Sequence, residues 1–385
     1  FMGLTVSAEE IIKDRRILKR ESFLNLSRLS YLVSKLVILF SLSAVQTLLF
    51  ILIGNAILGI QGMTFSFWLV MFSISCFANI MGLNISSAFN SAVTIYILIP
   101  LLIIPQLILS GVVVSFDKLH PWLSNNAKVP VIGEMMASRW GYEALLVSQF
   151  KDNAYEKEFF QYDQALANSE YKVSYYFSTI ESELDYILAN YRNADQKDKV
   201  ENKLTLVRNE LKKEMSIYEL PDSKFPALDS LYADKFDNSV LESTKKFIRI
   251  FKKIYNDQSK QVGKEKDQLI ASRLATPEGA LAYEKLKNEH ENENVVFYLK
   301  NKIAENRILN TGTELIRKID PIYMNPRPNG PLDFRAQFYA PQKHFAGKSF
   351  DTLSFNVIII WLMSITLILT LYFDVMRKIV NGFGK

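Results

Sequence analysis

Few residues of this sequence have a type and spacing that could do chemistry. The three histidines, at positions 120, 290 and 344, stand far apart. The segment NEHENE (288–293) is polar, and we expect it to be solvated rather than to hold a metal. The segment AGKSF (346–350) resembles the end of a phosphate-binding loop, but the first glycine of that motif is replaced by Gln342. There is no G-x-S-x-G nucleophile elbow. We therefore expect no catalytic, metal or cofactor site in this chain.

The remaining composition is informative mainly through the placement of charge. The single cysteine, Cys76, excludes an internal disulfide and any CxxC metal motif. The net charge of +5 divides into +3 over residues 1–35 and +2 over residues 374–385, whereas residues 117–351 hold 35 basic and 35 acidic side chains. The excess positive charge thus flanks apolar segments, and we do not expect nucleic acid as a partner.

Two long uncharged runs indicate what kind of scaffold positions the functional residues. Neither Leu36–Phe116, of 81 residues, nor Thr352–Phe373, of 22 residues, contains Asp, Glu, Lys, Arg or His. A hydrocarbon core about 30 Å thick is crossed by about 20 apolar residues in a helix. We therefore predict an all-α fold: a polytopic bundle of transmembrane helices joined to a large, mainly helical extracytoplasmic domain. Its four spans are expected at about 31–53, 65–85, 92–114 and 353–373.

Basic residues predict how the chain threads through the membrane. Those near the spans lie before the first and after the last, where Arg377, Lys378 and Lys385 follow it. The positive-inside rule places both termini in the cytoplasm, with residues 116–351 outside the cytoplasmic (inner) membrane. The expected order is a preceding span end and a cytoplasmic amphipathic helix in 1–30, three spans in 31–115, short re-entrant or outer helices in 116–150, an extracytoplasmic helical domain in 151–351, and the last span with a tail in 352–385.

The segment 151–351 has the periodicity of helices. Apolar residues recur every three or four positions, as on one face of a helix, and the polar stretch 192–198 between two such stripes predicts an antiparallel hairpin. Thr276-Pro277 predicts a helix start. The stripes are explained most simply by core packing; a long coiled hairpin that projects towards a partner is the alternative. They comprise Val173, Phe177, Ile180, Leu184, Ile187 and Tyr191; Val200, Leu204, Val207 and Leu211; and Val240, Thr244, Phe247, Phe251 and Ile254.

Residues 9–30 mix apolar and charged side chains and predict an amphipathic helix at a membrane surface. Such a helix could be a basic anchor that touches only lipid headgroups. Because acidic residues are interspersed among the basic ones, a docking helix for a cytoplasmic partner is favoured. The acidic residues are Glu9, Glu10, Asp14 and Glu21.

The third expected span contains Pro100 and Pro105, which kink a helix and free backbone carbonyls. Such a helix is suited to line a path, although a bent packing helix is the alternative. Because no ionisable residue lies near the midplane of the spans, a self-powered secondary transporter is not expected. The polar side chains that we expect to face other helices or a cavity are Gln46, Asn79, Asn84, Gln106 and Ser110.

Four blocks of sequence, taken in order, resemble a known family. They are EEIIKDRRILKRE (9–21), LSRLSYLVSKLVILFSLSAVQTLLF (26–50), GLNISSAFNSAVTIYILIPLLIIPQLILSGVVVSFDKL (82–119) and ASRWGYEALLVSQF (137–150). They resemble the membrane domain of ABC-2 type exporters, specifically G-subfamily (white/pleiotropic drug resistance-like) half-transporters and their bacterial relatives. The likeness covers about residues 1–150 and the last span.

The resemblance implies that the four spans are the family's third to sixth, and that Phe1–Ala8 ends the second. ATP and Mg would bind a nucleotide-binding domain that is not in this sequence, either fused upstream or separate, and ATP hydrolysis would occur there. A second copy of the chain is the other implied partner, with membrane lipid around both. The residues implied to couple to the ATPase are Glu10, Asp14, Arg16, Arg20 and Glu21. Those implied for the translocation path and gate are Pro100, Pro105, Gln106, Leu109, Ser110 and Gly111.

The segment 151–350 departs from the family, whose outer loop before the last span is short. We therefore expect a permease that exports a lipid-like, glycan or other amphipathic substrate by alternating access, with a periplasmic partner at this segment. The first alternative is a mechanotransmission complex, in which ATP-driven motion of the spans makes the outer domain regulate a periplasmic partner without transport. The second is a scaffold with no link to an ATPase.

Overall fold

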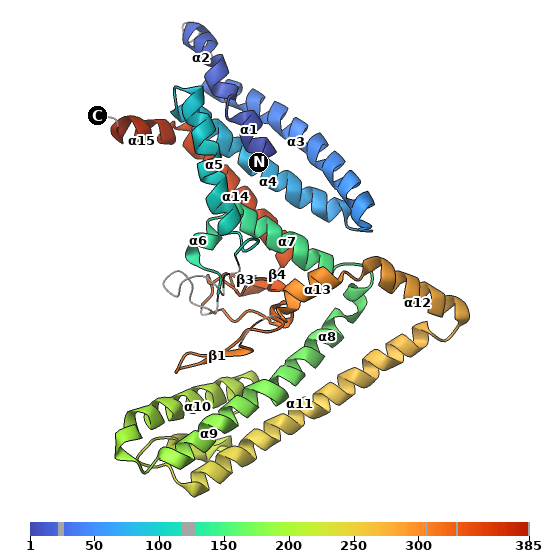
Figure 1. Cartoon of the computed structure of the whole chain (residues 1–385), viewed down its shortest axis with the longest axis vertical. Helices are drawn as coiled ribbons and strands as arrows, with labels where there is room; N and C mark the ends of the chain where they lie inside the picture. Colours follow the sequence, from blue (N-terminus) through green and yellow to red (C-terminus); the bar gives the residue numbers. More distant parts are fainter. Residues whose placement is uncertain are drawn as a thin grey trace. The chain divides into compact units, whose positions relative to one another are not determined.

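The computed structural model describes residues 1–21, 27–114, 116, 128–302, 304, 306–328 and 330–383, without the side chains of Lys19, Glu21 and Phe383. The described chain forms two compact units, and Figure 1 labels most of their helices and strands. We call Phe1–Glu156, Asn288–Val295 and Asn325–Lys385 the membrane unit, and Lys157–Lys287 with Val296–Met324 the helical unit.

The membrane unit is built from helices and one β-hairpin. Three of its helices, α3, α4 and α14, are long and apolar enough to cross a membrane, and α5 is a shorter apolar helix. They confirm the expected all-α, multi-pass membrane fold. The elements are α1 (Met2–Ser7), α2 (Glu10–Glu21), α3 (Arg28–Leu58), α4 (Thr64–Ala88), α5 (Ala92–Ile108), α6 (Val131–Glu134), α7 (Ala137–Lys151), the antiparallel pair β3 (Gln342–Phe345) and β4 (Lys348–Asp351), α14 (Thr352–Tyr372) and α15 (Val375–Phe383).

Helix α3 is longer than the expected span 31–53. It begins after Ser27, whose hydroxyl accepts a hydrogen bond from the Ser30 N–H, and it ends before Gly59, which has φ 68°. At 1.5 Å per residue a helix of this length extends about 45 Å. That exceeds the hydrocarbon thickness, so α3 either tilts or extends into the headgroup region.

Helix α5 is shorter than the span expected over 92–114. It ends at Ile108 and the chain turns at Gly111, which has φ 81°. A Cβ atom on Gly111 would lie 2.7 Å from the Phe338 ring, so the turn requires glycine for both its backbone and its space. The 17 residues of α5 extend about 25 Å.

Helix α4 is the centre of the membrane unit, because α1, α3 and α14 all pack against it. A Cβ atom on Gly82 would lie 2.0 Å from the Ser7 hydroxyl, so glycine permits the close approach of α1. Two asparagines of α4 contact neighbouring helices, as expected of polar groups in lipid. Asn79 donates to the Ser43 hydroxyl at 2.8 Å, and Asn84 donates to the Leu367 carbonyl at 2.9 Å.

The helical unit has its own apolar core, formed mainly by α9, α10 and α11. Its elements, some of whose ends belong to the membrane unit, are α8 (Glu156–Tyr171), the π-helical turn η3 (Lys172–Tyr176), α9 (Phe177–Asn190), η4 (Ala194–Gln196), α10 (Lys197–Ile217), η5 (Asp222–Lys224), η6 (Pro226–Ser230), α11 (Asn238–Arg273), α12 (Pro277–His290), α13 (Glu293–Lys300), the antiparallel pair β1 (Ile308–Asn310) and β2 (Leu315–Arg317), and η7 (Pro321–Tyr323).

Most of the predicted apolar stripes lie in this core. The predicted hairpin is α9 followed by α10, with Phe177, Leu184, Leu204 and Leu211 all fully buried. Core packing therefore explains the first two stripes. The third is partly wrong, because Ile254 is exposed. The buried residues of α11 are Leu241, Thr244, Ile248, Phe251 and Tyr255.

The start of α12 is confirmed. The helix begins at Pro277, and the Thr276 hydroxyl accepts a hydrogen bond from the Gly279 N–H at 3.1 Å. Proline at the first helical position loses no hydrogen bond, because that N–H has no partner in a helix.

Candidate functional site

Helix α2, which contains the residues predicted to couple to an ATPase, is seated on the end of α4. The backbone N–H groups of Ile11 and Ile12 donate to the Ser86 hydroxyl oxygen at 3.1 and 3.0 Å. The Arg15 guanidinium donates to the carbonyls of Ser87 at 3.2 Å and Phe89 at 3.0 Å. A cation at the carboxyl end of a helix satisfies carbonyls that lack partners and offsets the negative end of the helix dipole. Arg15 therefore caps α4 from α2.

Ion pairs connect α2 to the first turns of α3. The Lys35 ammonium lies 2.8 Å from a Glu10 carboxylate oxygen and 2.7 Å from an Asp14 carboxylate oxygen. The Tyr31 hydroxyl donates to Asp14 at 3.1 Å. All three charged side chains are no more than 30% exposed, so solvent screens them less than a surface pair. Lys35 thus holds two of the three predicted acidic coupling residues, Glu10 and Asp14, against α3.

Apolar contacts complete the seat of α2. Ile11 is buried with Leu32 and Leu39 of α3, Leu83 of α4 and Leu371 of α14. A displacement of α2 would therefore act on three membrane-crossing helices at one end of the bundle.

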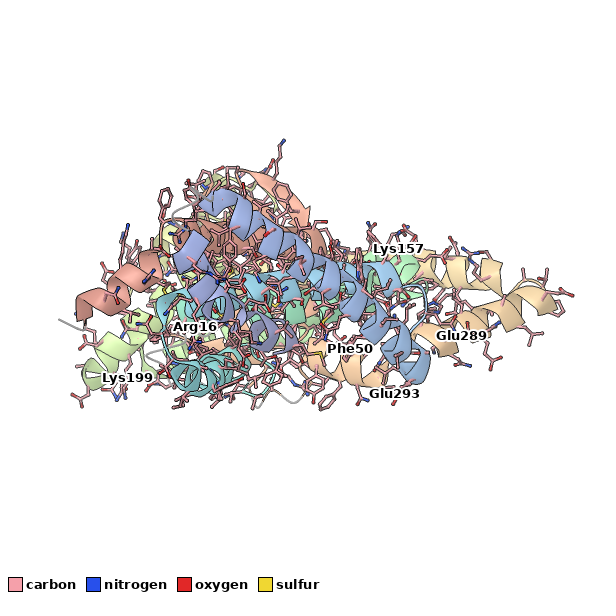
Figure 2. The ribbon with its side chains drawn as sticks, turned by 90° about the horizontal axis from the view of Figure 1, so that it is seen from above. Arg16, Phe50, Lys157, Lys199, Glu289 and Glu293 are labelled. Atoms are coloured by element: carbon pink, nitrogen blue, oxygen red, sulfur yellow. The ribbon has the colours of Figure 1, made fainter. Side chains whose placement is uncertain are left out.

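The opposite face of α2 is exposed. It comprises Lys13, Arg16, Ile17 and Arg20, which recur at steps of three and four. Hydrogen bonding to Glu9 raises the pKa of Lys13. Figure 2 labels Arg16 on this helix. The five predicted coupling residues thus divide: Glu10 and Asp14 face the bundle, Arg16 and Arg20 face away, and the side chain of Glu21 lies outside the described residues.

The residues predicted to line a path lie along α5 and the turn after it. Pro100 and Pro105 are on its exposed side. Gln106 points towards α7: the Ser138 N–H donates to its Oε1 at 3.3 Å, and the Ser138 hydroxyl lies 2.9 Å from the same oxygen. The Ser110 hydroxyl donates to the Leu107 carbonyl at 2.7 Å. Leu109 is half-buried, while Ser110 and Gly111 are buried. The predicted path residues therefore all lie on α5 or on the turn that follows it. Among the described residues, only Gln106 of this set forms side-chain hydrogen bonds to another helix.

Beyond Ser138, the partner of Gln106, helix α7 contributes Glu143 to a buried charged cluster. Glu143 is fully buried and accepts hydrogen bonds from the Lys343 ammonium at 2.7 Å, the Asn356 amide at 3.0 Å and the Tyr339 N–H at 3.0 Å. These partners come from β3, α14 and the segment before β3. The cluster thus fastens α7 to the final span and its preceding hairpin.

Arg139 adds a second cation to this cluster. Its guanidinium lies 3.1 Å from Glu134 and 3.5 Å from Glu143, and 4.0 Å above the Trp140 ring. Within the described part of the chain its nitrogens have ion-pair distances but no aligned hydrogen bond. Charge and the ring face therefore hold Arg139 in place. Every acid here is matched by a cation, so the cluster is suited to fastening rather than to proton transfer.

From the sequence, only the part of this cluster that lies on α7 could be singled out. The block ASRWGYEALLVSQF includes Arg139 and Glu143, but the partner Lys343 lies 200 residues further on. No local pattern pairs residues at that separation.

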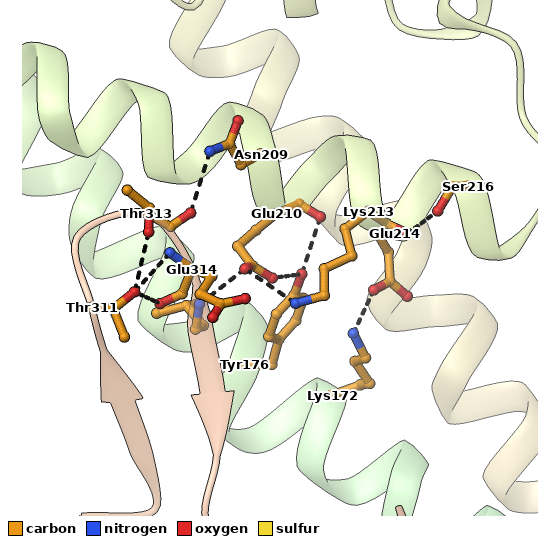
Figure 3. Close-up of polar contacts among 11 residues, drawn as sticks. Lys172, Tyr176, Asn209, Glu210, Lys213, Glu214, Ser216, Thr311, Thr313 and Glu314 are labelled. Atoms are coloured by element: carbon orange, nitrogen blue, oxygen red, sulfur yellow. Dashed lines mark hydrogen bonds and ion pairs between the residues drawn. The ribbon is translucent and has the colours of Figure 1, made fainter. Parts of the chain in front are cut away.

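The helical unit buries a second set of acids, shown in Figure 3. Glu210 accepts hydrogen bonds from the Tyr176 hydroxyl at 2.8 Å and the Leu315 N–H at 2.9 Å. Glu214 is paired with Lys172 and with the Tyr255 hydroxyl. Burial raises the pKa of both Tyr176 and Tyr255, so both stay protonated as donors. The acids are thus satisfied, and they connect α10 to η3, α11 and β2.

The π-helical turn η3 explains how two donors reach these acids. It carries Lys172 and Tyr176 at its two ends, and each contacts a different glutamate of α10. One widened turn shifts the register between α8 and α9, as single π-turns do. No sequence pattern indicates this turn, because its residues fit an ordinary helical stripe.

These features define the class of protein first: a multi-pass helical membrane protein with an amphipathic helix seated on its spans. Residues 1–150 match the family model of the ABC-2 type transporter. The match supports an ABC-2 type transporter membrane domain over this part of the chain, and with it a permease component of an ABC transporter. No curated protein and no solved structure matches the chain.

Proposed function

We propose that this chain is the transmembrane permease part of an ATP-driven exporter in the cytoplasmic membrane, working by alternating access. The observation that carries the proposal is the seat of α2. A helix at the bundle end is tied to α3 through Lys35 and to α4 through Ser86 and Arg15, within a segment that matches a transporter family.

The two faces of α2 suggest how ATP hydrolysis would move the spans. The exposed face, with Lys13, Arg16 and Arg20, is available to a nucleotide-binding domain that carries ATP and Mg. The inner face, with Glu10 and Asp14, passes displacement of α2 to α3 through Lys35. Rigid helices joined by fixed ion pairs and buried contacts transmit such a displacement.

The outer surface of α5 supports a path between two copies of the chain. Val93, Ile97, Leu101 and Ile104 are each more than half exposed. A contiguous apolar face of this kind is covered either by lipid or by another protein. We propose that a second copy faces α5, with the path between the copies and Gln106 to Gly111 at its outer gate.

The presence of the helical unit favours one class of substrate. With residues 116–351 outside the cytoplasm, the helical unit would be an extracytoplasmic domain with its own core. A lipid-like, glycan or other amphipathic substrate, passed on to a periplasmic partner, gives such a domain a role that export of a small hydrophobic compound does not.

Charge reversal at the α2 seat tests the proposal. We would measure ATPase activity of the full-length protein with its nucleotide-binding domain, in lipid and in detergent. Lys35→Glu places three acids together, and we expect loss of the stimulation of ATPase activity by lipid and substrate. Adding Glu10→Lys to this variant should restore part of the stimulation, because one opposite-charge pair returns.

A matched control is available in the helical unit. Lys199 is exposed on α10, so Lys199→Glu makes the same charge change away from the seat and should leave the stimulation intact. Arg20→Glu changes the face proposed for the ATPase and should also uncouple it, without altering the stability of the membrane unit. Stimulation that survives both Lys35→Glu and Arg20→Glu would remove α2 from the coupling route.

One observation favours a second candidate, mechanotransmission. The helical unit has its own core, and its buried acids are satisfied by partners on several elements, so it could move as a body. In that case ATP would change the activity of a periplasmic partner, and nothing would cross the membrane. Accumulation of substrate inside inside-out vesicles on addition of ATP would exclude this candidate.

A further inference from the structure

Helix α15, which follows the last span, is strongly amphipathic. At about 100° per residue, Val375, Met376, Ile379 and Val380 fall on one side of α15, within an arc of about 140°. Arg377, Lys378 and Asn381 fall on the other. Met376 and Ile379 are exposed, although α15 packs against α4. An apolar face therefore remains to be covered.

The chain geometry places α15 next to the bilayer edge. Only Phe373 and Asp374 separate it from α14, a helix long and apolar enough to cross the membrane. Asp374 has φ 53°, so the chain turns there and α15 does not continue the axis of α14 (Figure 1). Tyr372 and Phe373 are exposed at this end, where aromatic side chains mark the level of the headgroups.

Contacts fix the turn between the two helices. The Arg28 guanidinium pairs with the Asp374 carboxylate and donates to the Leu371 carbonyl at 3.0 Å. The hydrogen bond from Arg28 is the largest cause of a lowered pKa at Asp374, so this carboxyl remains charged. Arg28 thus caps α14 in the way that Arg15 caps α4.

Positive charge gathers at this corner in excess of the one acid. Arg28, Arg377 and Lys378 all act on Asp374, and Arg28 already pairs with it directly. Arg377 also lies near Arg15: burial, and then the charge of Arg377, lower the pKa of Arg15. Arginines that approach one another favour an anion near the space that they share.

We propose that α15 lies flat in the membrane interface, with its apolar face among the acyl chains and with Arg377 and Lys378 on the phosphates of anionic phospholipids. The immediate continuity with a membrane span favours lipid over a protein partner. Basic residues beside a span attract anionic headgroups by about 1 kcal/mol each, which corresponds to about fivefold per charge. This inference concerns lipid recognition and does not depend on transport.

The first test measures which face of α15 meets lipid. Full-length protein with Cys76→Ala would receive a single label at Ile379→Cys on the apolar face or at Asn381→Cys on the polar face. In nanodiscs with nitroxide on the upper acyl chain, the label at position 379 should be quenched several-fold more than that at position 381. Equal quenching would overturn the flat orientation. A label at 379 that is shielded from water and is not quenched by lipid would indicate a covering protein, and would overturn the lipid assignment.

The second test measures charge recognition. Energy transfer from the label at position 381 to acyl-labelled phosphatidylglycerol, relative to labelled phosphatidylcholine, reports local lipid preference. We expect a preference for phosphatidylglycerol that falls about fivefold for each charge removed in Arg377→Gln/Lys378→Gln. Both side chains are exposed, so folding should be unaffected, and unchanged elution and circular dichroism would verify it.

The matched control is Lys197→Gln/Lys199→Gln, an equal charge change at two exposed positions of α10 in the helical unit; Figure 2 labels Lys199. It should leave the lipid preference unchanged. The proposal is overturned if the unaltered chain shows no preference, or if both double variants behave alike.

Discussion

At the scale of single residues, Glu143 explains why α7, α14 and β3 stay together. It is fully buried and its carboxylate is surrounded by Lys343, Asn356, Arg139 and the Tyr339 N–H. A buried charge is tolerated only when it is paired and hydrogen-bonded, so each partner matters more than its contact area suggests.

Lys343→Met should therefore destabilise the membrane unit strongly. Removing one partner of a buried ion pair leaves the other charge uncompensated, at a cost of about 3–5 kcal/mol. Thermal unfolding of the full chain in detergent would show a large fall in melting temperature. Lys348→Met, at an exposed position of the neighbouring strand β4, is the control and should change the melting temperature little.

Gly111 is the second residue on which local structure depends. Gly111→Ala places a Cβ atom 2.7 Å from Phe338 at a backbone φ of 81°, so both contact and conformation oppose it. We expect a loss of about 1–3 kcal/mol, seen as a lower melting temperature. Gly263→Ala, in the middle of α11 with open space around it, should be neutral or slightly stabilising. Equal melting temperatures for the two variants would contradict the account of this turn.

At the scale of elements, α2 is held on α4 by hydrogen bonds from its backbone N–H groups as well as by ion pairs. The buried Ser86 hydroxyl accepts from two consecutive N–H groups at the start of α2. An N-terminal helix turn whose N–H groups lack acceptors is prone to open.

Ser86→Ala should accordingly loosen α2 without unfolding α4. Hydrogen exchange should become faster at Ile11 and Ile12, by an amount that corresponds to about 1–3 kcal/mol for donors left unsatisfied. Ser91→Ala, at an exposed position before α5, serves as the control. Unchanged exchange at Ile11 and Ile12 in Ser86→Ala would show that this hydroxyl does not hold α2.

The membrane helices and the α9–α10 hairpin could be predicted from the sequence. Charge-free runs predicted the membrane helices, because lipid excludes charge over a whole helix length. Stripes at steps of three and four predicted the α9–α10 hairpin. On α11 the predicted stripe shares Thr244 and Phe251 with the observed one but is displaced elsewhere, because a broad apolar arc fits two neighbouring registers.

The functional contacts were harder to predict for a physical reason. Glu10 and Asp14 are predicted on α2, but their partner Lys35 lies on another helix, α3. Lys343 lies 200 residues from Glu143. Such pairings depend on how elements dock, and local periodicity contains no information on docking.

At the scale of the whole molecule, the helical unit should fold by itself. Its core includes Phe177, Leu204 and Ile248, all fully buried, and its acids are satisfied within the unit. A fragment of residues 157–324 should be helical and should unfold cooperatively. Leu204→Ala should destabilise it by about 2–5 kcal/mol in denaturant, whereas Lys212→Ala, at an exposed position of the same helix, should have little effect. A fragment without a cooperative transition would contradict the independence of the unit.

We propose that ATP hydrolysis displaces α2 and, through α4, moves α5, whose Ile95 and Ile99 pack with Ile85 of α4. Spin labels at Leu101→Cys, in the Cys76→Ala background, would report the distance between α5 of two copies in the full-length protein with its ATPase in lipid. We predict that ATP with vanadate shifts this distance distribution, and that Lys35→Glu abolishes the shift. Identical distributions with and without nucleotide in the unaltered seat would contradict the claim.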